Sequence, residues 1–201
     1  MSLQCTAIAL GLYGSVKDRV TVRLANSVTG LRDTPDGVEA QFLTGAPETF
    51  DLVLGADGLH STVRRLIFGE ESRFERFLGY HVAAFSTQGY RHRDPHVYVT
   101  YGEPGRQIWR ITLGEDTTVF LLVFAEDDPL ALPQHDALQQ KDILARRYAG
   151  GGWETDEMLA ALATTTDLYF DRVSQIDMPR WSSGRVALIG DACACPSLLA
   201  G

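Results

Sequence analysis

Two short stretches far apart in the sequence have the residue types of a ligand-binding loop. Asp57 and Gly58 follow the apolar run 50–56, and Gly190 and Asp191 follow the apolar run 186–189. In open α/β sheets, ligands bind beyond the carboxyl ends of the strands, where both acidic residues would lie. An ionised carboxylate only accepts hydrogen bonds, so it suits a ribose or polyol hydroxyl, and a glycine beside it lets a ligand approach the backbone. Taken alone, however, the Gly190-Asp191 pair indicates a plain turn more often than a site.

Other residues with reactive side chains form no recognisable catalytic or metal-binding pattern. No Ser-His-Asp or Cys-His arrangement can be argued from the spacing, so the catalytic residues are unknown. His92 and His96 are separated by Pro95, which blocks a shared helical face, and no third ligand is evident, so we predict no metal. The three cysteines, one of them Cys195, indicate buried thiols in a reducing cytoplasm rather than a disulfide framework.

Composition sets the broad class of the protein. The length of 201 residues allows one large domain or two small ones, and 45% hydrophobic and 22% charged residues are ordinary for a globular chain. A net charge of -8 without a basic stripe argues against a nucleic-acid partner. The apolar runs are too short for a bilayer and no signal peptide is visible, so we expect no membrane partner and a cytoplasmic location.

The chain must position the two loops with a mixture of strands and helices. We predict strands at 20–30, 38–43, 50–56 (buried), 80–87, 97–101, 108–113, 118–125 and 186–189 (buried, as in a parallel sheet), an extended segment at 167–176, and helices up to residue 12 and at 62–68, 133–148 and 154–163. Ser61 is the expected cap of the helix at 62–68. For Arg64 within that helix, a solvated position and a role at the ligand loop are both open.

The residues of both loops match two sequence motifs of one family. Asp57, Gly58, Ser61 and Arg64 fit D-G-x-x-S-x-x-R, and Gly190, Asp191 and Ala192 fit G-D-A. In this order the motifs resemble those of FAD-dependent monooxygenases of the aromatic-hydroxylase (p-hydroxybenzoate hydroxylase-like) family. The resemblance implies an α/β fold (an α+β mixture): a partial FAD-binding Rossmann-like domain at 1–71 and 181–201, with an antiparallel-sheet substrate domain inserted at 72–180.

The resemblance also implies a function. A flavoprotein of this family binds FAD, takes electrons from NAD(P)H and uses O₂ to oxygenate an aromatic or other small organic substrate through a flavin hydroperoxide. Gly190, Asp191 and Ala192 would then bind the ribityl and pyrophosphate region, and Pro196 would lie beside the isoalloxazine. Asp57, Gly58 and Arg64 would stabilise the neighbouring loop, with Arg64 adding positive potential near the phosphates. Four aromatic residues of the inserted sheet could line the substrate pocket, although core packing is the preferred interpretation of each: Phe85, Tyr98, Trp109 and Phe120.

The sequence departs from the family in two ways. It contains no G-x-G-x-x-G fingerprint, so we expect an internal piece lacking that N-terminal part and the C-terminal part. Ala194 stands where many members have His, and Cys195 beside it is either a reactive thiol or an inert one. Three alternatives to a monooxygenase therefore stay open: a halogenase, a reductase on the same scaffold, or a non-catalytic truncated module that self-associates through surfaces left by the missing flanks.

Overall fold

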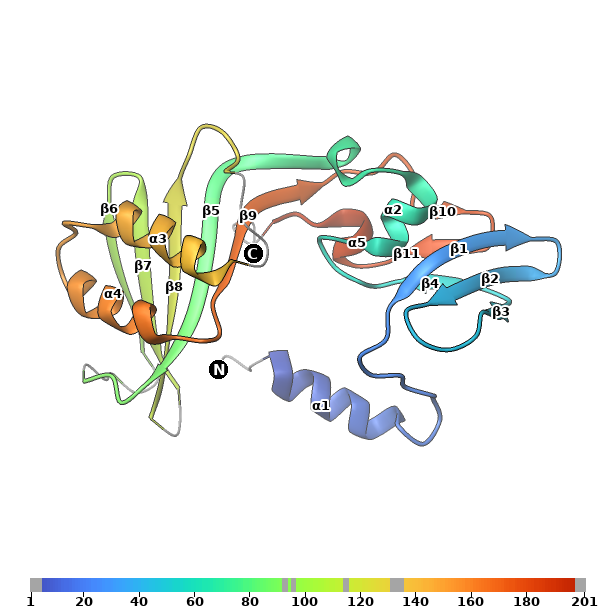
Figure 1. The fold of residues 1–201 in the computed structure, drawn as a ribbon, viewed down its shortest axis with the longest axis horizontal. Helices are drawn as coiled ribbons and strands as arrows, with labels where there is room; N and C mark the ends of the chain where they lie inside the picture. Colours follow the sequence, from blue (N-terminus) through green and yellow to red (C-terminus); the bar gives the residue numbers. More distant parts are fainter. Residues whose placement is uncertain (1–4, 92–93, 95–96, 114–115, 131–135, 198–201) are drawn as a thin grey trace.

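A computed structural model describes residues 5–91, 94, 97–113, 116–130 and 136–197. It has two lobes, with β5 and β9 extending from one toward the other (Figure 1). One lobe holds a five-stranded sheet with two helices against it, and the other holds two three-stranded sheets and two shorter helices. The mixed α/β fold confirms the predicted class.

The larger sheet is antiparallel throughout and has the strand order β6-β7-β8-β5-β9. Its strands are β5 (Glu75–Gln88), β6 (Tyr98–Glu103), β7 (Arg106–Thr112), β8 (Thr117–Ala125) and β9 (Tyr169–Ile176). These confirm the four strands predicted between 80 and 125 and the extended segment at 167–176. Alternate residues of β8 enter the core, because successive side chains of a strand point to opposite faces.

Helices α3 (Ala137–Tyr148) and α4 (Thr155–Thr164) cover one face of this sheet (Figure 1). Asp136 caps α3 by accepting a hydrogen bond from the backbone N–H of Gln139. The sequence pattern predicts the start of this helix at 133, and residues 133–135 lie outside the described part. Phe85 and Phe120 are buried in the core between sheet and helices, which confirms the packing interpretation for these two. Trp109 alternates with the buried Ile108 and therefore lies on the opposite face.

In the other lobe, two strands from distant parts of the sequence run parallel. Strand β4 (Val53–Gly55) pairs with β11 (Val186–Leu188), and the short β10 (Ser182–Ser183) completes that sheet. A Cβ on Gly55 would lie 2.7 Å from Leu188 Cδ2 and 2.8 Å from Val63 Cβ, so only glycine allows this approach. The parallel pairing predicted for the strand before Gly190 is confirmed.

The second sheet of this lobe is a meander of β1 (Val28–Thr34), β2 (Gly37–Phe42) and β3 (Glu48–Phe50). Helix α2 (Thr62–Phe68), the 3₁₀ turn η1 (Glu71–Arg73) and helix α5 (Asp191–Ala194) complete the lobe. Its core is a cluster of eight buried residues: Val38, Val63, Ile176, Met178, Val186, Leu188, Ala192 and Cys193. Helix α1 (Cys5–Val16) agrees with the helix predicted at the start of the chain.

Two predicted strands differ from the structure. The strand predicted at 20–30 starts only at Val28 and continues to Thr34, and the apolar side chains of residues 20–24, which precede it, are exposed. The segment 50–56 is not one buried strand, because it divides into β3 and β4 and leaves Phe50, Leu52 and Leu54 exposed. Val53 packs on the core, so Leu54 must point to the opposite face. No described element covers that face at Leu54, which is 55% exposed.

Candidate functional site

The parallel pairing of β4 and β11 brings the two predicted loops to one edge of their sheet. Val53 is opposite Val186 and Gly55 is opposite Leu188, and the N–H of Ile189 donates to the carbonyl of Gly55 at 2.9 Å. Both strands therefore end at the same level, and the chain continues from each into its Asp motif. Residues 57 and 191, which are far apart in the sequence, follow neighbouring strand ends, where the fold class places ligands.

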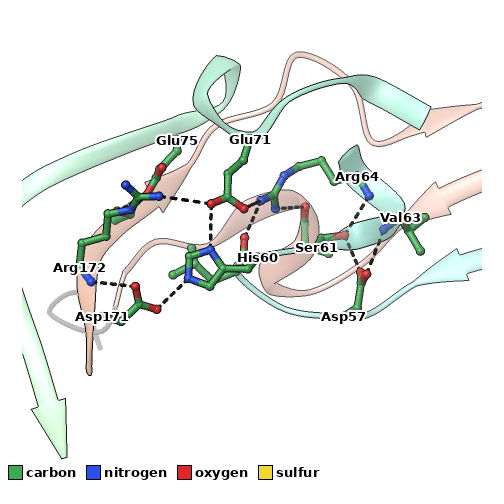
Figure 2. Close-up of polar contacts among 12 residues, drawn as sticks. Asp57, His60, Ser61, Val63, Arg64, Glu71, Glu75, Asp171 and Arg172 are labelled. Atoms are coloured by element: carbon green, nitrogen blue, oxygen red, sulfur yellow. Dashed lines mark hydrogen bonds and ion pairs between the residues drawn. The ribbon is translucent and has the colours of Figure 1, made fainter. Parts of the chain in front are cut away.

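The carboxylate of Asp57 organises its own loop (Figure 2). One oxygen accepts the Ser61 hydroxyl at 2.5 Å and the other accepts the N–H of Val63 at 3.0 Å. Ser61 in turn accepts the N–H of Arg64 at 2.9 Å, as predicted for the cap of α2. Gly58 has φ +79°, a conformation that favours glycine, and so completes the turn. The Asp57 carboxylate is thus used in capping a helix.

Arg64 joins the two motifs. Its side chain is fully buried, so the interpretation as a solvated residue is wrong. The guanidinium donates to the carbonyl of Ala192 in the second motif at 3.0 Å and to that of Leu59 in the first at 2.5 Å. It also forms an ion pair with Glu71 at 2.7 Å. Since both terminal nitrogens of the guanidinium are bonded to protein groups, two of them in the two motif loops, Arg64 acts by holding the two loops together.

The Gly190 loop leaves its ligand-facing side open. Gly190 has φ 61° and ψ −142°, and a Cβ built on it would meet nothing within 4 Å. Its carbonyl accepts the N–H groups of Cys193 and Ala194, which starts α5. Gly190 and Asp191 are exposed, whereas Ala192 is fully buried beneath them. The second motif therefore presents a bare backbone and one carboxylate at the surface.

A cavity of about 290 Å³ lies between this loop and β9. Two of the predicted cofactor-binding residues, Asp191 and Pro196, line it. The carbonyl of Pro196 accepts a hydrogen bond from the Gln175 amide at 3.1 Å, which ties the loop to β9. Most of the wall is apolar or aromatic, with Leu59, Val82, Tyr169 and Val173 among the lining residues. An apolar space edged by a carboxylate suits a ring system that carries a polyol chain, as flavin does.

One part of this region, the surroundings of His60, leaves no signal in the sequence. The His60 ring lies 2.8 Å from Glu71 through Nδ1 and 2.8 Å from Asp171 through Nε2 (Figure 2). Hydrogen bonds to Asp171 and then to Glu71 raise the pKa of His60 to about 10. Asp171 is 111 positions away in the sequence, so no local spacing could reveal the pair.

Of the two cysteines in and beside the second motif, Cys193 is buried and Cys195 is half-buried at the cavity wall. No group of three or more His, Cys, Asp and Glu side chains that could hold a metal occurs within the described ranges, and His92 and His96 lie outside them. Among helices in the described part of the chain, none has both the length and the apolar character needed to cross a bilayer.

Comparison with known proteins agrees with this geometry. No family model matches the chain. A flavin-dependent monooxygenase from an unknown prokaryote is 35% identical over 179 residues, which cover 88% of this chain and 46% of that protein. The chain is homologous to flavin-dependent monooxygenases. An uncharacterised protein of Mycobacterium tuberculosis strain H37Rv is 38% identical over 94% of the chain and 51% of its own length. The chain thus spans about half the length of the curated relatives it matches.

Two solved structures share the fold of this chain. The tetracycline destructase Tet(51) is 32% identical, with a TM-score of 0.74 over 86% of this chain and 46% of that one. HpxO of Klebsiella pneumoniae, solved with FAD and uric acid, is 22% identical with a TM-score of 0.68, covering 97% of this chain and 49% of that one. At that identity the second likeness concerns the fold alone. The resemblance drawn from the Asp57 and Asp191 motifs is confirmed.

Proposed function

We propose that this chain forms the flavin-facing and substrate-facing part of an FAD-dependent monooxygenase that uses NAD(P)H and O₂ to hydroxylate a small aromatic or other organic substrate. The observation that carries the proposal is the pair of motif loops, joined through Arg64, beside a cavity lined by Asp191 and Pro196. The homology to flavin-dependent monooxygenases supports it. Bound FAD would supply the redox chemistry of oxygen transfer.

In this proposal the protein binds and orients the cofactor and the substrate and does not itself react. Asp191 accepts hydrogen bonds from hydroxyls of the ribityl chain, and the exposed backbone at Gly190 allows the cofactor to come close. Pro196 and Tyr169 offer flat surfaces to the ring system. The conformation of both loops is stabilised by four residues that do not contact the cofactor: Asp57, Gly58, Arg64 and Ala192. Water is excluded by the apolar wall, which protects reactive species bound within.

We extend the proposal to organisation and partners. Residues 1–71 and 181–201 would belong to the FAD-binding domain and residues 72–180 to the substrate domain, in a cytoplasmic protein. Six exposed apolar side chains of the lobe that contains both motifs would favour self-association of this chain: Leu43, Phe50, Leu52, Leu54, Trp181 and Ile189.

A titration with FAD tests the proposed site. We expect quenching of flavin fluorescence by the chain, and at least tenfold weaker binding for Asp191→Ala, because one good hydrogen bond to a charged group contributes about 1.5–3 kcal/mol. Asp36→Ala is the matched control, since Asp36 is an exposed carboxylate in the turn between β1 and β2. Equal affinity of the two variants for FAD would refute the role of Asp191.

A further inference from the structure

A chain of hydrogen bonds connects the Asp57 loop to the cavity wall. His60 bridges Glu71, on η1, and Asp171, on β9, with both contacts at 2.8 Å. The Asp171 oxygen that contacts His60 also accepts the hydroxyl of Tyr169 at 3.1 Å. Tyr169 lines the cavity, whereas His60 is not among the residues that line it. His60 therefore lies two hydrogen bonds away from a wall that it does not form.

The partners fix where the hydrogens are. Both neighbours of the imidazole are carboxylates, which only accept hydrogen bonds, so both ring nitrogens donate. Hydrogen bonds to Asp171 and Glu71 raise the pKa of His60 to about 10, and the ring is charged at neutral pH. Burial, followed by the charge of Asp171, raises the pKa of Tyr169 well above its usual range. The neutral Tyr169 hydroxyl consequently donates its hydrogen to Asp171, which sets the direction of the ring.

Two arginines balance the negative charge of the carboxylates around His60. Arg64 pairs with Glu71 at 2.7 Å, and Arg172 pairs with Glu75 at 2.6 Å and reaches Glu71 at 3.6 Å (Figure 2). Arg172 also donates its backbone N–H to the second Asp171 oxygen at 2.8 Å. Asp171 is thus held from its own strand and, through His60, from the other lobe.

We propose that His60 is a positioning residue that, through Asp171, holds the ring of Tyr169 as an aromatic wall for a planar ring system in the cavity. The inference rests on the proposed function, which supplies two such ring systems, the flavin and an aromatic substrate. Both present a flat π-face, and an aromatic side chain contributes most to binding when it is already held in the stacking orientation.

The first experiment tests the positioning without any ligand. The chain has seven tyrosines, so a sample labelled with 3-fluorotyrosine gives a small set of ¹⁹F resonances, and the one lost in Tyr169→Phe identifies Tyr169. We expect His60→Gln to shift and narrow this resonance, because the ring gains mobility, while Arg65→Ala on the exposed side of α2 leaves it unchanged. An unchanged Tyr169 resonance in a folded His60→Gln variant would overturn the proposal.

The second experiment is a double-mutant cycle on ligand affinity. Dissociation constants for riboflavin and, separately, for phenol are measured with the wild-type chain, His60→Gln, Tyr169→Phe and the double variant. We expect each single change to lower the affinity for one of the two ligands roughly 3- to 10-fold. The double variant should bind that ligand no more weakly than the more affected single variant, because both changes release the same ring. Weaker binding of riboflavin would identify the flavin as the ring system that stacks on Tyr169, and weaker binding of phenol would identify the substrate.

The outcomes separate the two proposals. Fold losses that multiply in the double variant would show that His60 acts independently of Tyr169 and would overturn the inference. The inference also fails if His60→Gln leaves both affinities unchanged. If the wild-type chain binds neither probe, the proposed function of the cavity fails, and the ¹⁹F result still decides whether His60 positions Tyr169.

Discussion

Arg64 is the residue on which the two motif loops depend most, and its replacement by alanine should destabilise the chain strongly. The change removes a fully buried guanidinium with three partners, at 2.5, 2.7 and 3.0 Å. Breaking a buried ion pair costs about 3–5 kcal/mol, because the remaining charge is left unpaired. Glu71 keeps His60 at 2.8 Å and Arg172 at 3.6 Å as partners and is 23% exposed, so its carboxylate stays partly compensated after the change. We therefore expect the lower part of that range, about 3 kcal/mol.

Urea unfolding at pH 7 measures this loss. With a slope of about 2 kcal/mol/M, a loss of about 3 kcal/mol lowers the midpoint by roughly 1.5 M. Arg64→Lys should retain part of the stability, since an ammonium keeps the charge but cannot reach all three acceptors. Arg65→Ala is the matched control on the exposed side of the same helix and should change stability by no more than about 0.5 kcal/mol. If Arg64→Ala and Arg65→Ala unfold at the same urea concentration, Arg64 does not join the loops.

Individual contacts elsewhere in the chain lead to four further expectations. The pKa of His60 lies at about 10, above its unfolded value, so the stabilising effect of His60 is complete below about pH 6.5 and is lost as pH rises towards 10. In urea unfolding, His60→Gln should lack this decline in stability, and an identical decline in the variant would contradict the pairing of His60 with Asp171 and Glu71. Burial lowers the pKa of His81 to about 4, so the free energy of unfolding should fall as pH drops from about 6.5 to 4. An NMR titration should find the His81 ring of the folded chain still neutral at about pH 5.5, and a ring already protonated there would contradict the burial effect. Ser61→Ala removes the cap of α2 and should cost about 1 kcal/mol in urea unfolding, with no loss counting against the capping role. Gly55→Ala places a Cβ 2.7 Å from Leu188 and should lower stability by about 1–3 kcal/mol, whereas no change would show that β4 and β11 can separate freely.

Local sequence patterns predict the parts of this structure that depend on neighbouring residues. The alternating strands of the large sheet, the cap at Ser61 and the two Asp motifs each leave a signal within a few residues. The core positions of Phe85 and Phe120 follow from their place as aromatic residues in strands. The parallel pairing before Gly190 follows from a short, unbroken apolar run.

The features that local patterns miss depend on contacts between distant segments. Nothing near Arg64 in the sequence shows that its partners are the carbonyls of residues 59 and 192. From the sequence alone, the Arg64 side chain could therefore be buried or exposed. His60 meets Asp171 only because β9 lies against the Asp57 loop. The error at 50–56 has the opposite cause. A continuous apolar run is typical of a strand covered on both faces, and here one face remains exposed at Leu54.

The most direct test of the flavin site is the visible absorption spectrum of the chain after incubation with excess FAD and removal of free cofactor by gel filtration. We predict that flavin bands stay with the protein and that Asp191→Ala loses them. A colourless wild-type protein would contradict the claim that the joined loops and the cavity beside β9 form a flavin site in this chain.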